Sequence, residues 1–554
     1  MPYIRTKTFK NKDGSIREYL VLVEGTRVDG KVRQKVLATI GRIDELKKGG
    51  GLERLKASLD RFMGLEMNAE TEQKSLDLVS AKKFGAVYFL EQIWEKLGYK
   101  KILNLKLGQK QQEALFCIVA NRLLEPCSKL GIESWKKQIF KSSWDKLEVQ
   151  HFYRAMDSLM AHGSEISEAI GKASLALSKA KTTLVMFDTT SIMHWGEGEY
   201  SDILDYGYSK EKRGDLRQIM VGILMTADGI PFGYKVWRGN QSDVKSFSIV
   251  LQELQLKYGI DEVIWVADRG MLSKKNIELL EELKVKYILG VRMRKLDQET
   301  RQKLLGEPEG FVPINNKLRV KNVWIEDKRY IVCENLAEAT KAKQQREFFK
   351  EILAKKVELD TAKSFLIKNG YKKYLNLDGE LKIDWDRFEA EAVYDGKWVL
   401  ATNTHLTDKT IGQAYKDLWK IERAFRTLKS PLAVDPMFHW TDKRIEAHVF
   451  LCFMALQIYL FIKNGLNTPE LCAVYQANLP NEVKHKSNKK KRTPSVDFAL
   501  NELDTIHAVT QQTGYRKMIT HLTRISPIAD LIFKTFTIKK PKYIHDLPSD
   551  DQVV

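Results

Sequence analysis

The feature that most constrains this chain is the apolar run of residues 184–187, which ends at Asp188. Such a run predicts a buried β-strand that carries one carboxylate to the edge of a sheet. The pattern recurs at residues 263–267, where a second apolar run is followed by Asp268 and Arg269. Carboxylates held close together repel each other unless a cation neutralises them. The two acids are therefore either separate surface residues or ligands of one divalent-metal site.

A third carboxylate, Glu422, lies in a segment with helical periodicity. Apolar residues recur along this segment with the spacing of one helix face: Ile411, Leu418, Ile421, Phe425 and Leu428. This spacing predicts one helix through residues 415–429. Because steps of seven nearly superimpose on a helix, Tyr415, Glu422 and Lys429 share a stripe, with Arg426 one turn after Glu422. An acid among cations fits either a phosphate-handling site or a solvated face with an ordinary ion pair.

Taken in order, the three segments resemble the catalytic core of DDE transposases from prokaryotic insertion sequences. In one branch of these enzymes the third acid sits in a Tyr-x-x-Arg-x-x-x-Glu-x-x-x-x-x-x-Lys signature. The resemblance covers about residues 184–456 and matches Asp188, Asp268 and Glu422 to the three catalytic, metal-binding acids. It implies an enzyme that cleaves DNA at the ends of an insertion sequence and joins those ends to target DNA.

The signature also implies which residues contact DNA. Tyr415 and Lys429 fall at its spacing, whereas Leu418 occupies its arginine position, as is usual in one subgroup of the family. The phosphate contact of that arginine then falls to Lys420 or Arg426. The residues expected to bind DNA are Tyr415, Arg426, Lys429 and Arg269.

The order strand, hairpin, helix, strand, helix, strand within residues 184–291 fits an α/β fold with a ribonuclease-H-like core, a mixed sheet flanked by helices. The stretch between Asp268 and Glu422 is longer than one crossover connection requires, which indicates an insertion. We expect a small basic β unit at 1–48, a helical DNA-end-binding and dimerisation region at 52–181, core halves at 182–300 and 396–466, a β-rich insertion with a charged helix at 301–395, and a basic C-terminal region at 467–554.

The charge balance agrees with a polyanionic partner. Lys and Arg number 91 against 72 Asp and Glu, which leaves a net charge of +19 at pH 7, and an excess of this size favours nucleic acid. Basic side chains also surround the strands predicted at residues 18–24 and 34–40. These side chains either contact phosphates or form a solvated face.

Nothing in the sequence predicts a membrane protein. No apolar signal-peptide core follows Met1, and the longest apolar stretch, residues 447–462, is shorter than the roughly 20 residues that a spanning helix needs. The five cysteines lack metal-ligand spacing and are interpreted as reduced core residues. We expect a cytoplasmic prokaryotic protein that is nucleoid-associated when bound to DNA.

The resemblance implies two Mg²⁺ ions as cofactors, with Mn²⁺ as the alternative, because hard cations prefer carboxylate oxygens. It also implies double-stranded DNA as partner, both inverted-repeat ends and target, and a homodimer on paired ends. Two alternatives stay open. One is a catalytically inactive, transposase-derived DNA-binding protein, and the other is a metal-dependent nuclease without strand transfer.

A few residues carry weaker hypotheses. Trp324 and Trp385 are candidates for an aromatic residue in the insertion that holds a displaced base, although they fit core tryptophans better. His439 and His448 lack a His-x-x-x-His pattern and are interpreted as supporting or core histidines rather than metal ligands. The basic run at residues 484–492 is either a loop that tracks phosphates or a solvated linker.

Overall fold

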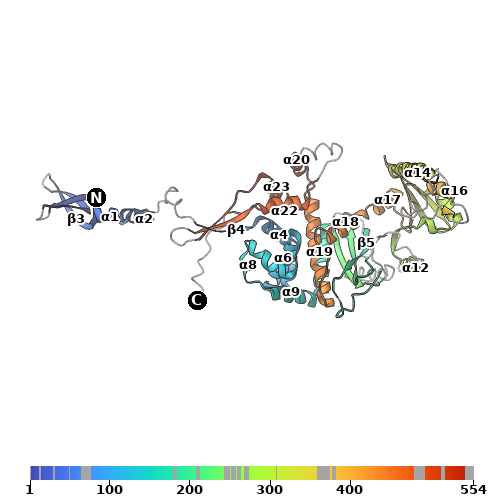
Figure 1. The fold of residues 1–554 in the computed structure, drawn as a ribbon, viewed down its shortest axis with the longest axis horizontal. Helices are drawn as coiled ribbons and strands as arrows, with labels where there is room; N and C mark the ends of the chain where they lie inside the picture. The colour runs from blue at the N-terminus through green and yellow to red at the C-terminus, as the bar shows by residue number, and fades with distance from the viewer. Residues whose placement is uncertain are drawn as a thin grey trace. The chain divides into compact units, whose positions relative to one another are not determined.

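The computed structural model describes residues 2–10, 14–28, 31–48, 50–63, 77–178, 184–196, 198–207, 213–241, 250, 257–258, 264–267, 274–282, 284–306, 309–357, 375–376, 382–478, 493–512 and 518–542. Contacts divide the chain into two compact units (Figure 1). The first unit contains Met1–Ala81 and Val509–His521, and the second contains Lys82–Ala508 and Leu522–Lys542. Asp268, Arg269 and the basic run at 484–492 lie outside the described residues.

The first unit is built on small sheets, of which the N-terminal one is antiparallel. The two strands predicted near the N-terminus lie within β2 (Ile16–Val28) and β3 (Lys31–Arg42), and β1 (Pro2–Lys10) completes the order β1-β2-β3. β1 was not predicted because every residue of this strand is exposed, so it lacks the apolar alternation of a half-buried strand. The remaining elements are α1 (Ile43–Lys48), α2 (Gly51–Met63) and a sheet of order β17-β16-β4 formed by β4 (Asp77–Lys83), β16 (His507–Gln512) and β17 (Met518–Leu522).

The second unit begins with a helical region. Strand β4 (Asp77–Lys83) interrupts the range 52–181 that was predicted to be helical. The helices of this region are α4 (Gly85–Lys96), α5 (Tyr99–Asn104), α6 (Gln109–Leu124), α7 (Lys129–Trp135), α8 (Ser142–Asp145), α9 (Val149–Ala161) and α10 (Gly163–Leu177). Helix α6 is the centre of this region, because an unbroken run from Ala114 to Leu123 is buried and the helix packs on α9 and α19.

Nine of the described strands form one mixed sheet of order β10-β11-β12-β15-β9-β8-β5-β6-β7. Its strands are β5 (Leu184–Met193), β6 (Gln218–Thr226), β7 (Pro231–Arg238), β8 (Ile264–Ala267), β9 (Lys286–Gly290), β10 (Val312–Asn315), β11 (Leu318–Ile325), β12 (Lys328–Asn335) and β15 (Lys397–Thr402). β5, β8 and β9 are parallel to one another, and the other pairings are antiparallel. The predicted β6–β7 hairpin is confirmed, with Gly229 in its turn.

The strands that follow β9 continue the core sheet. β15 runs antiparallel to β9, and Leu400 pairs with Gly290. The start of β15 therefore lies at the edge where the parallel strands end, and β12 ends at the same edge because Glu334 pairs with Lys397. Around these strands lie α12 (Lys274–Glu282), α13 (Gln298–Leu305), α14 (Leu336–Val357), α16 (Trp385–Ala390) and the short pair β13 (Leu375–Asn376) and β14 (Lys382–Ile383).

A helical segment, and not a hairpin, leads into β15. Residues 385–390 form α16 and residues 391–394 form a 3₁₀ turn, so β15 enters the sheet directly from a helical segment. The cause is a helix cap, because the side chain of Asp384 accepts a hydrogen bond from the backbone N–H of Arg387 at 2.9 Å. β15 then pairs with two strands that are distant in sequence, β12 and β9.

Helices complete the second unit. They are α17 (Asp408–Lys416), α18 (Trp419–Lys429), α19 (Asp442–Gly465), α20 (Pro469–Ala477), α22 (Val496–Asp504) and α23 (Pro527–Thr535). Helix α19 packs on α6 and α9 on one side and on β7 and α18 on another (Figure 1). It is long and apolar enough to cross a membrane, yet 89% of its most apolar 18-residue window is buried inside the protein. It is therefore the central core helix of this unit.

Candidate active site

Asp188 lies in the middle of β5, not at the end of a strand as the sequence predicted. β5 continues to Met193 because Thr189, Thr190 and Ser191, all buried, pair with β6. β-branched and small hydroxyl side chains fit such a pleated, covered surface. Among the described residues, β8 pairs with β5 from Leu184 to Met186, and β6 pairs with β5 from Val185 to Met193.

Glu422 lies in the first turn of α18. The prediction of one continuous helix through residues 415–429 is wrong, because α17 ends at Lys416 and α18 begins at Trp419. Leu418 is buried at this break, with 7% of its surface exposed. α17 packs on β8, β9, β11 and β12, whereas α18 packs on β5 and α19. The break thus lets each short helix follow a different part of a twisted sheet.

Asp188 and Glu422 line the same cavity, which has a volume of about 520 Å³. Tyr415 lines it as well, so the structure brings together residues from two of the sequence motifs. Asp188 is half-buried, and its Oδ1 accepts a hydrogen bond from the backbone N–H of Thr189 at 2.8 Å. Glu422 is exposed to solvent. The other lining residues are Asn335, Glu338, Gly396, Lys397, Trp398, Lys416, Leu418, Trp419 and Ile421.

Arg426 and Lys429 do not line this cavity, and Arg269 is not among the described residues. Arg426 is exposed on α18, and Lys429 is half-buried in the last turn of the same helix. Lys420 is already engaged, since its Nζ donates a hydrogen bond to the backbone oxygen of Ala227 at 2.6 Å and forms an ion pair with Asp417 at 3.1 Å. Of the two substitutes for the signature arginine, only Arg426 remains available to an external phosphate.

Several cavity residues were missed by the sequence reasoning. Lys397 and Trp398 come from β15, and Trp419 comes from the start of α18. The tryptophans singled out earlier do not line the cavity, and Trp324 is instead 62% exposed on β11. No local signal marks Lys397 or Trp398, because their place at the site depends on the pairing of β15 with β9 and β12.

The two histidines near the start of α19 belong to the core. His448 is 3% exposed, and its Nε2–H donates a hydrogen bond to the backbone oxygen of Val434 at 3.1 Å. Burial lowers the pKa of His439 to about 3 and holds the pKa of His448 well below its usual value, and the nearby cations Arg122 and Lys129 act in the same direction. Burial likewise lowers the pKa of Lys129 to about 7. Burial and the neighbouring cations disfavour the charged form of both imidazoles, and neither histidine lines the cavity.

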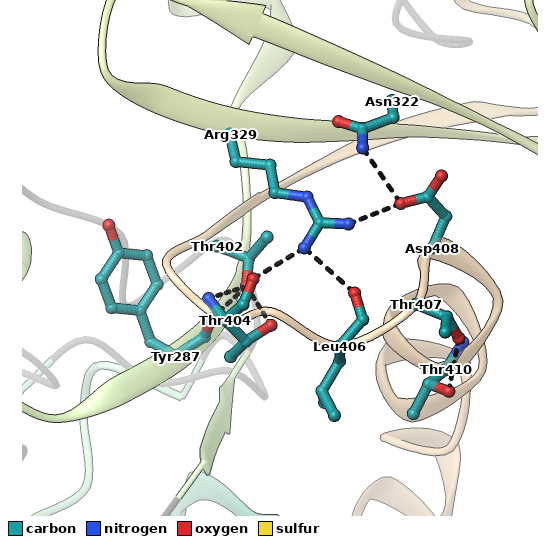
Figure 2. A network of polar contacts seen from close by, with 9 residues as sticks. All are labelled: Tyr287, Asn322, Arg329, Thr402, Thr404, Leu406, Thr407, Asp408 and Thr410. Atoms are coloured by element: carbon teal, nitrogen blue, oxygen red, sulfur yellow. Dashed lines mark hydrogen bonds and ion pairs between the residues drawn. The ribbon is translucent and has the colours of Figure 1, made fainter.

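A polar network fixes the loop that leads from β15 into α17 (Figure 2). The guanidinium of Arg329 on β12 donates to the backbone oxygens of Thr404 at 2.6 Å and Leu406 at 3.0 Å, and it pairs with Asp408 at 2.6 Å. The hydroxyl of Thr402 donates to the backbone oxygen of Tyr287 on β9 at 2.7 Å. These bonds tie the start of α17, and thus the position of the helix that carries Tyr415, to the sheet.

The donor set fits a hard divalent cation. Asp188 and Glu422 offer carboxylate oxygens in one cavity, which neither thiol nor imidazole lines, and oxygen ligands are those that Mg²⁺ and Mn²⁺ prefer. Within the described part of the chain, no three His, Cys, Asp or Glu side chains form a cluster able to hold a metal. Asp268 follows Ala267 in the sequence and lies outside that part.

One solved structure that resembles the chain is the piggyBac transposase, in a synaptic complex with hairpin DNA. The similarity covers 72% of this chain and 71% of that chain, with 8% sequence identity and a TM-score of 0.36. This overlap is too low to equate individual site residues. No curated protein matches the chain.

Two family models match the sequence itself. The model described as IS1634 family transposase, N-terminal domain, matches residues 4–71. The model described as transposase DDE domain matches residues 179–458, half of the chain, and this span includes β5, the cavity and most of α19. The chain therefore belongs to the DDE transposases of insertion sequences.

Proposed function

We propose that this transposase cleaves DNA at the ends of its insertion sequence and joins those ends to target DNA. The observation that carries the proposal is that Asp188 and Glu422, from β5 and α18, line one cavity. Two acids that are distant in sequence and lie in the same cavity fit the walls of a metal-dependent phosphoryl-transfer site. Asp268, the second acid of the motif set, completes the proposed catalytic group.

The sheet supports a ribonuclease-H-like core. Within it the order β7-β6-β5-β8-β9 combines an antiparallel hairpin with three parallel strands. This arrangement agrees with the fold expected from the sequence, and the strands from β15 to β10 extend it on the β9 side.

Asp188, Asp268 and Glu422 would hold the divalent cations, with Mg²⁺ as the physiological ion and Mn²⁺ as the alternative. Bound there, the ions would neutralise charge on the phosphate and lower the pKa of the attacking water or hydroxyl. The chain's own carboxylates would supply oxygen ligands, and Trp398, Trp419 and Tyr415 line the same cavity.

The reaction needs no covalent protein intermediate. In cleavage, the oxygen of water bonds to phosphorus, the bond from phosphorus to the 3′ oxygen breaks, and the proton of water passes through solvent to the departing 3′ oxygen. In strand transfer, the 3′-hydroxyl of the transposon end bonds to a target phosphorus, and the target 3′ oxygen leaves as a hydroxyl. Arg426 and Lys429 would hold flanking phosphates by charge, and the Tyr415 hydroxyl would donate a hydrogen bond to a phosphate oxygen.

The proposed partners are double-stranded inverted-repeat ends and target DNA, bound by a homodimer. The helical region at residues 52–181 is proposed to bind the ends and support dimerisation, and Arg269 to contact DNA beside the second acid. The excess of 91 Lys and Arg over 72 Asp and Glu supports a polyanionic partner.

The test is cleavage of DNA that carries the native element ends in the presence of Mg²⁺. We expect nicks at the ends with wild type, loss of nicking with chelator, and loss with Asp188→Asn and Glu422→Gln. Both variants must fold and bind the ends like wild type. If both variants cut like wild type, the site assignment is wrong. If no form cuts although all forms bind, the protein is a DNA-binding derivative, and cleavage without joined target products identifies a nuclease.

A further inference from the structure

We infer that Lys397 is a substrate-positioning residue that holds a backbone phosphate of the cleaved DNA strand against the cavity. The inference rests on the proposed function and adds a contact that lies outside the family signature. Lys397 is the first residue of β15 and lines the cavity that contains Asp188 and Glu422. It approaches the site from the sheet extension, whereas the signature residues approach from α17 and α18.

Lys397 lines two cavities. It lines the candidate active site, and it also lines a second cavity of about 540 Å³ beside α14 and α16. A DNA strand that passes from one cavity to the other would cross the side chain of Lys397. A lysine ammonium is a compact cation that contacts phosphate oxygens as a point charge.

Among the described residues, Lys397 differs from the other cations of the second cavity because no acid forms an ion pair with it. The others all form ion pairs: Lys343 with Glu347, Arg346 with Asp395 and Lys350 with Glu389. Glu334, which is opposite Lys397 in the β12–β15 register, is instead bound by Arg319. No carboxylate in the described part of the chain lies within ion-pair distance of Lys397. A half-buried cation without a counter-charge favours an anion from outside.

The backbone around Lys397 is held in place. Gly396 has a φ of +62°, and a Cβ there would lie 2.5 Å from the backbone oxygen of Asn335 and 2.6 Å from the backbone nitrogen of Ala339. The N–H of Asn335 donates to the backbone oxygen of Gly396 at 2.8 Å. Asn335 Oδ1 also caps α14 by accepting from the N–H groups of Ala337 and Glu338 at 3.1 and 3.3 Å. The lysine is therefore presented by a fixed wall, which lowers the entropy cost of the contact.

The test uses the full-length protein and DNA with the native element ends. Lys397→Met keeps the aliphatic stem and removes the charge, Lys397→Arg keeps the charge, and Lys350→Met is the matched control because Lys350 lines the second cavity with an acid partner. We expect Lys397→Met to slow single-turnover cleavage on the order of 100-fold, the lower end of the range seen when one positioned donor is removed. Lys397→Arg should recover most of the rate, and Lys350→Met should stay near wild type.

A second experiment distinguishes a phosphate contact of Lys397 from a purely structural role. In separate DNA substrates, a neutral methylphosphonate replaces either the scissile phosphate or one of its neighbours. With wild type, one of these substitutions should slow cleavage, and with Lys397→Met the same substitution should have no further effect. A purely structural lysine would leave the sensitivities of the two proteins equal, and this result would overturn the inference. If folded Lys397→Met cuts like wild type, the inference also fails while the proposed function stands. If wild type itself does not cut the ends, the proposed function fails, and the inference fails with it.

Discussion

Arg329 on β12 and Asp408 at the start of α17 form an ion pair of 2.6 Å in which the arginine side chain is only 10% exposed (Figure 2). The same guanidinium donates to two backbone oxygens of the loop between β15 and α17. One side chain thus joins the sheet extension to the helix that carries Tyr415. The pair is a structural support for one wall of the candidate active site.

Replacing Arg329 with alanine leaves Asp408 and two backbone oxygens without their donor. We expect Arg329→Ala to lower the free energy of unfolding by about 3 kcal/mol, the scale for breaking a largely buried pair. Urea denaturation measures this change. Lys303→Ala removes an exposed pair with Glu299 and should cost less than about 0.5 kcal/mol. Equal losses in the two variants would contradict the supporting role of Arg329.

Arg426 and Lys420 should differ in DNA binding although they lie on the same helix. Lys420 is held by Ala227 and Asp417, whereas Arg426 is exposed. We expect Arg426→Ala to reduce the slope of log affinity against log salt by about 0.9, the value for one lost phosphate contact, and Lys420→Ala to leave the slope unchanged. Titrations of element-end DNA at several salt concentrations measure both slopes. The reverse result would assign the contact to Lys420.

Gly396 should tolerate no side chain. Gly396→Ala combines a left-handed backbone with close approach to Asn335 and Ala339, and we expect a loss of about 3 kcal/mol in unfolding free energy. Gly229 also has a positive φ, of 85°, but a Cβ there meets nothing closer than Lys420 Cδ at 3.5 Å. Gly229→Ala should therefore lower the free energy of unfolding only by the cost of a left-handed backbone at a residue with a Cβ, about 1 kcal/mol. Thermal or urea unfolding compares the two.

The buried histidines make stability depend on pH. His439 has a folded pKa of about 3, and the unfolded chain takes up its proton near the ordinary value of 6.5. The neutral imidazole thus contributes stability that is complete above about pH 6.5 and is lost as the pH falls toward 3. The charged and titratable groups that face it lie on α6, on α7, on α19 and directly after β5: Arg122, Lys129, Arg444, His448 and His194.

Between pH 7.5 and 5.5 we expect the His439 term to remove about 1 kcal/mol of unfolding free energy. His439→Phe keeps a ring against Tyr153 and removes the titration, so its stability should fall less over the same range. Chemical denaturation at the two pH values tests this. An equal or steeper fall in His439→Phe would show that His439 is not the source of the pH dependence.

The sequence predicted the elements that depend on local pattern. The β6–β7 hairpin follows from apolar runs around Gly229, and α19 follows from a long apolar stretch. Asp188 was placed one step wrongly, at a strand end, because Thr189 to Ser191 are polar yet buried against β6. Burial of polar residues depends on the neighbouring strand, and a single sequence does not contain that information.

The cavity walls were less predictable than the acids. Asp188, Tyr415 and Glu422 were found from motif spacing, whereas Lys397 and Trp398 reach the site only because β15 pairs with β9 and β12. The break before Trp419 likewise depends on two helices packing on different strands. Contacts between segments distant in sequence decide both the position of β15 and the helix break before Trp419. The break was not predicted because the helical periodicity of the apolar residues continues across it.

Helix α19 has a consequence for shortened copies of this gene. The helix is covered on one side by α6 and α9, which precede the catalytic half of the chain, and on the other by elements of that half. A product that begins at residue 179 would present 24 largely apolar residues with half of their covering lost. Such a product exposes a long apolar segment of the kind that chaperones and proteases bind. Truncation of the gene should thus eliminate the protein itself, and not only its ability to recognise DNA ends.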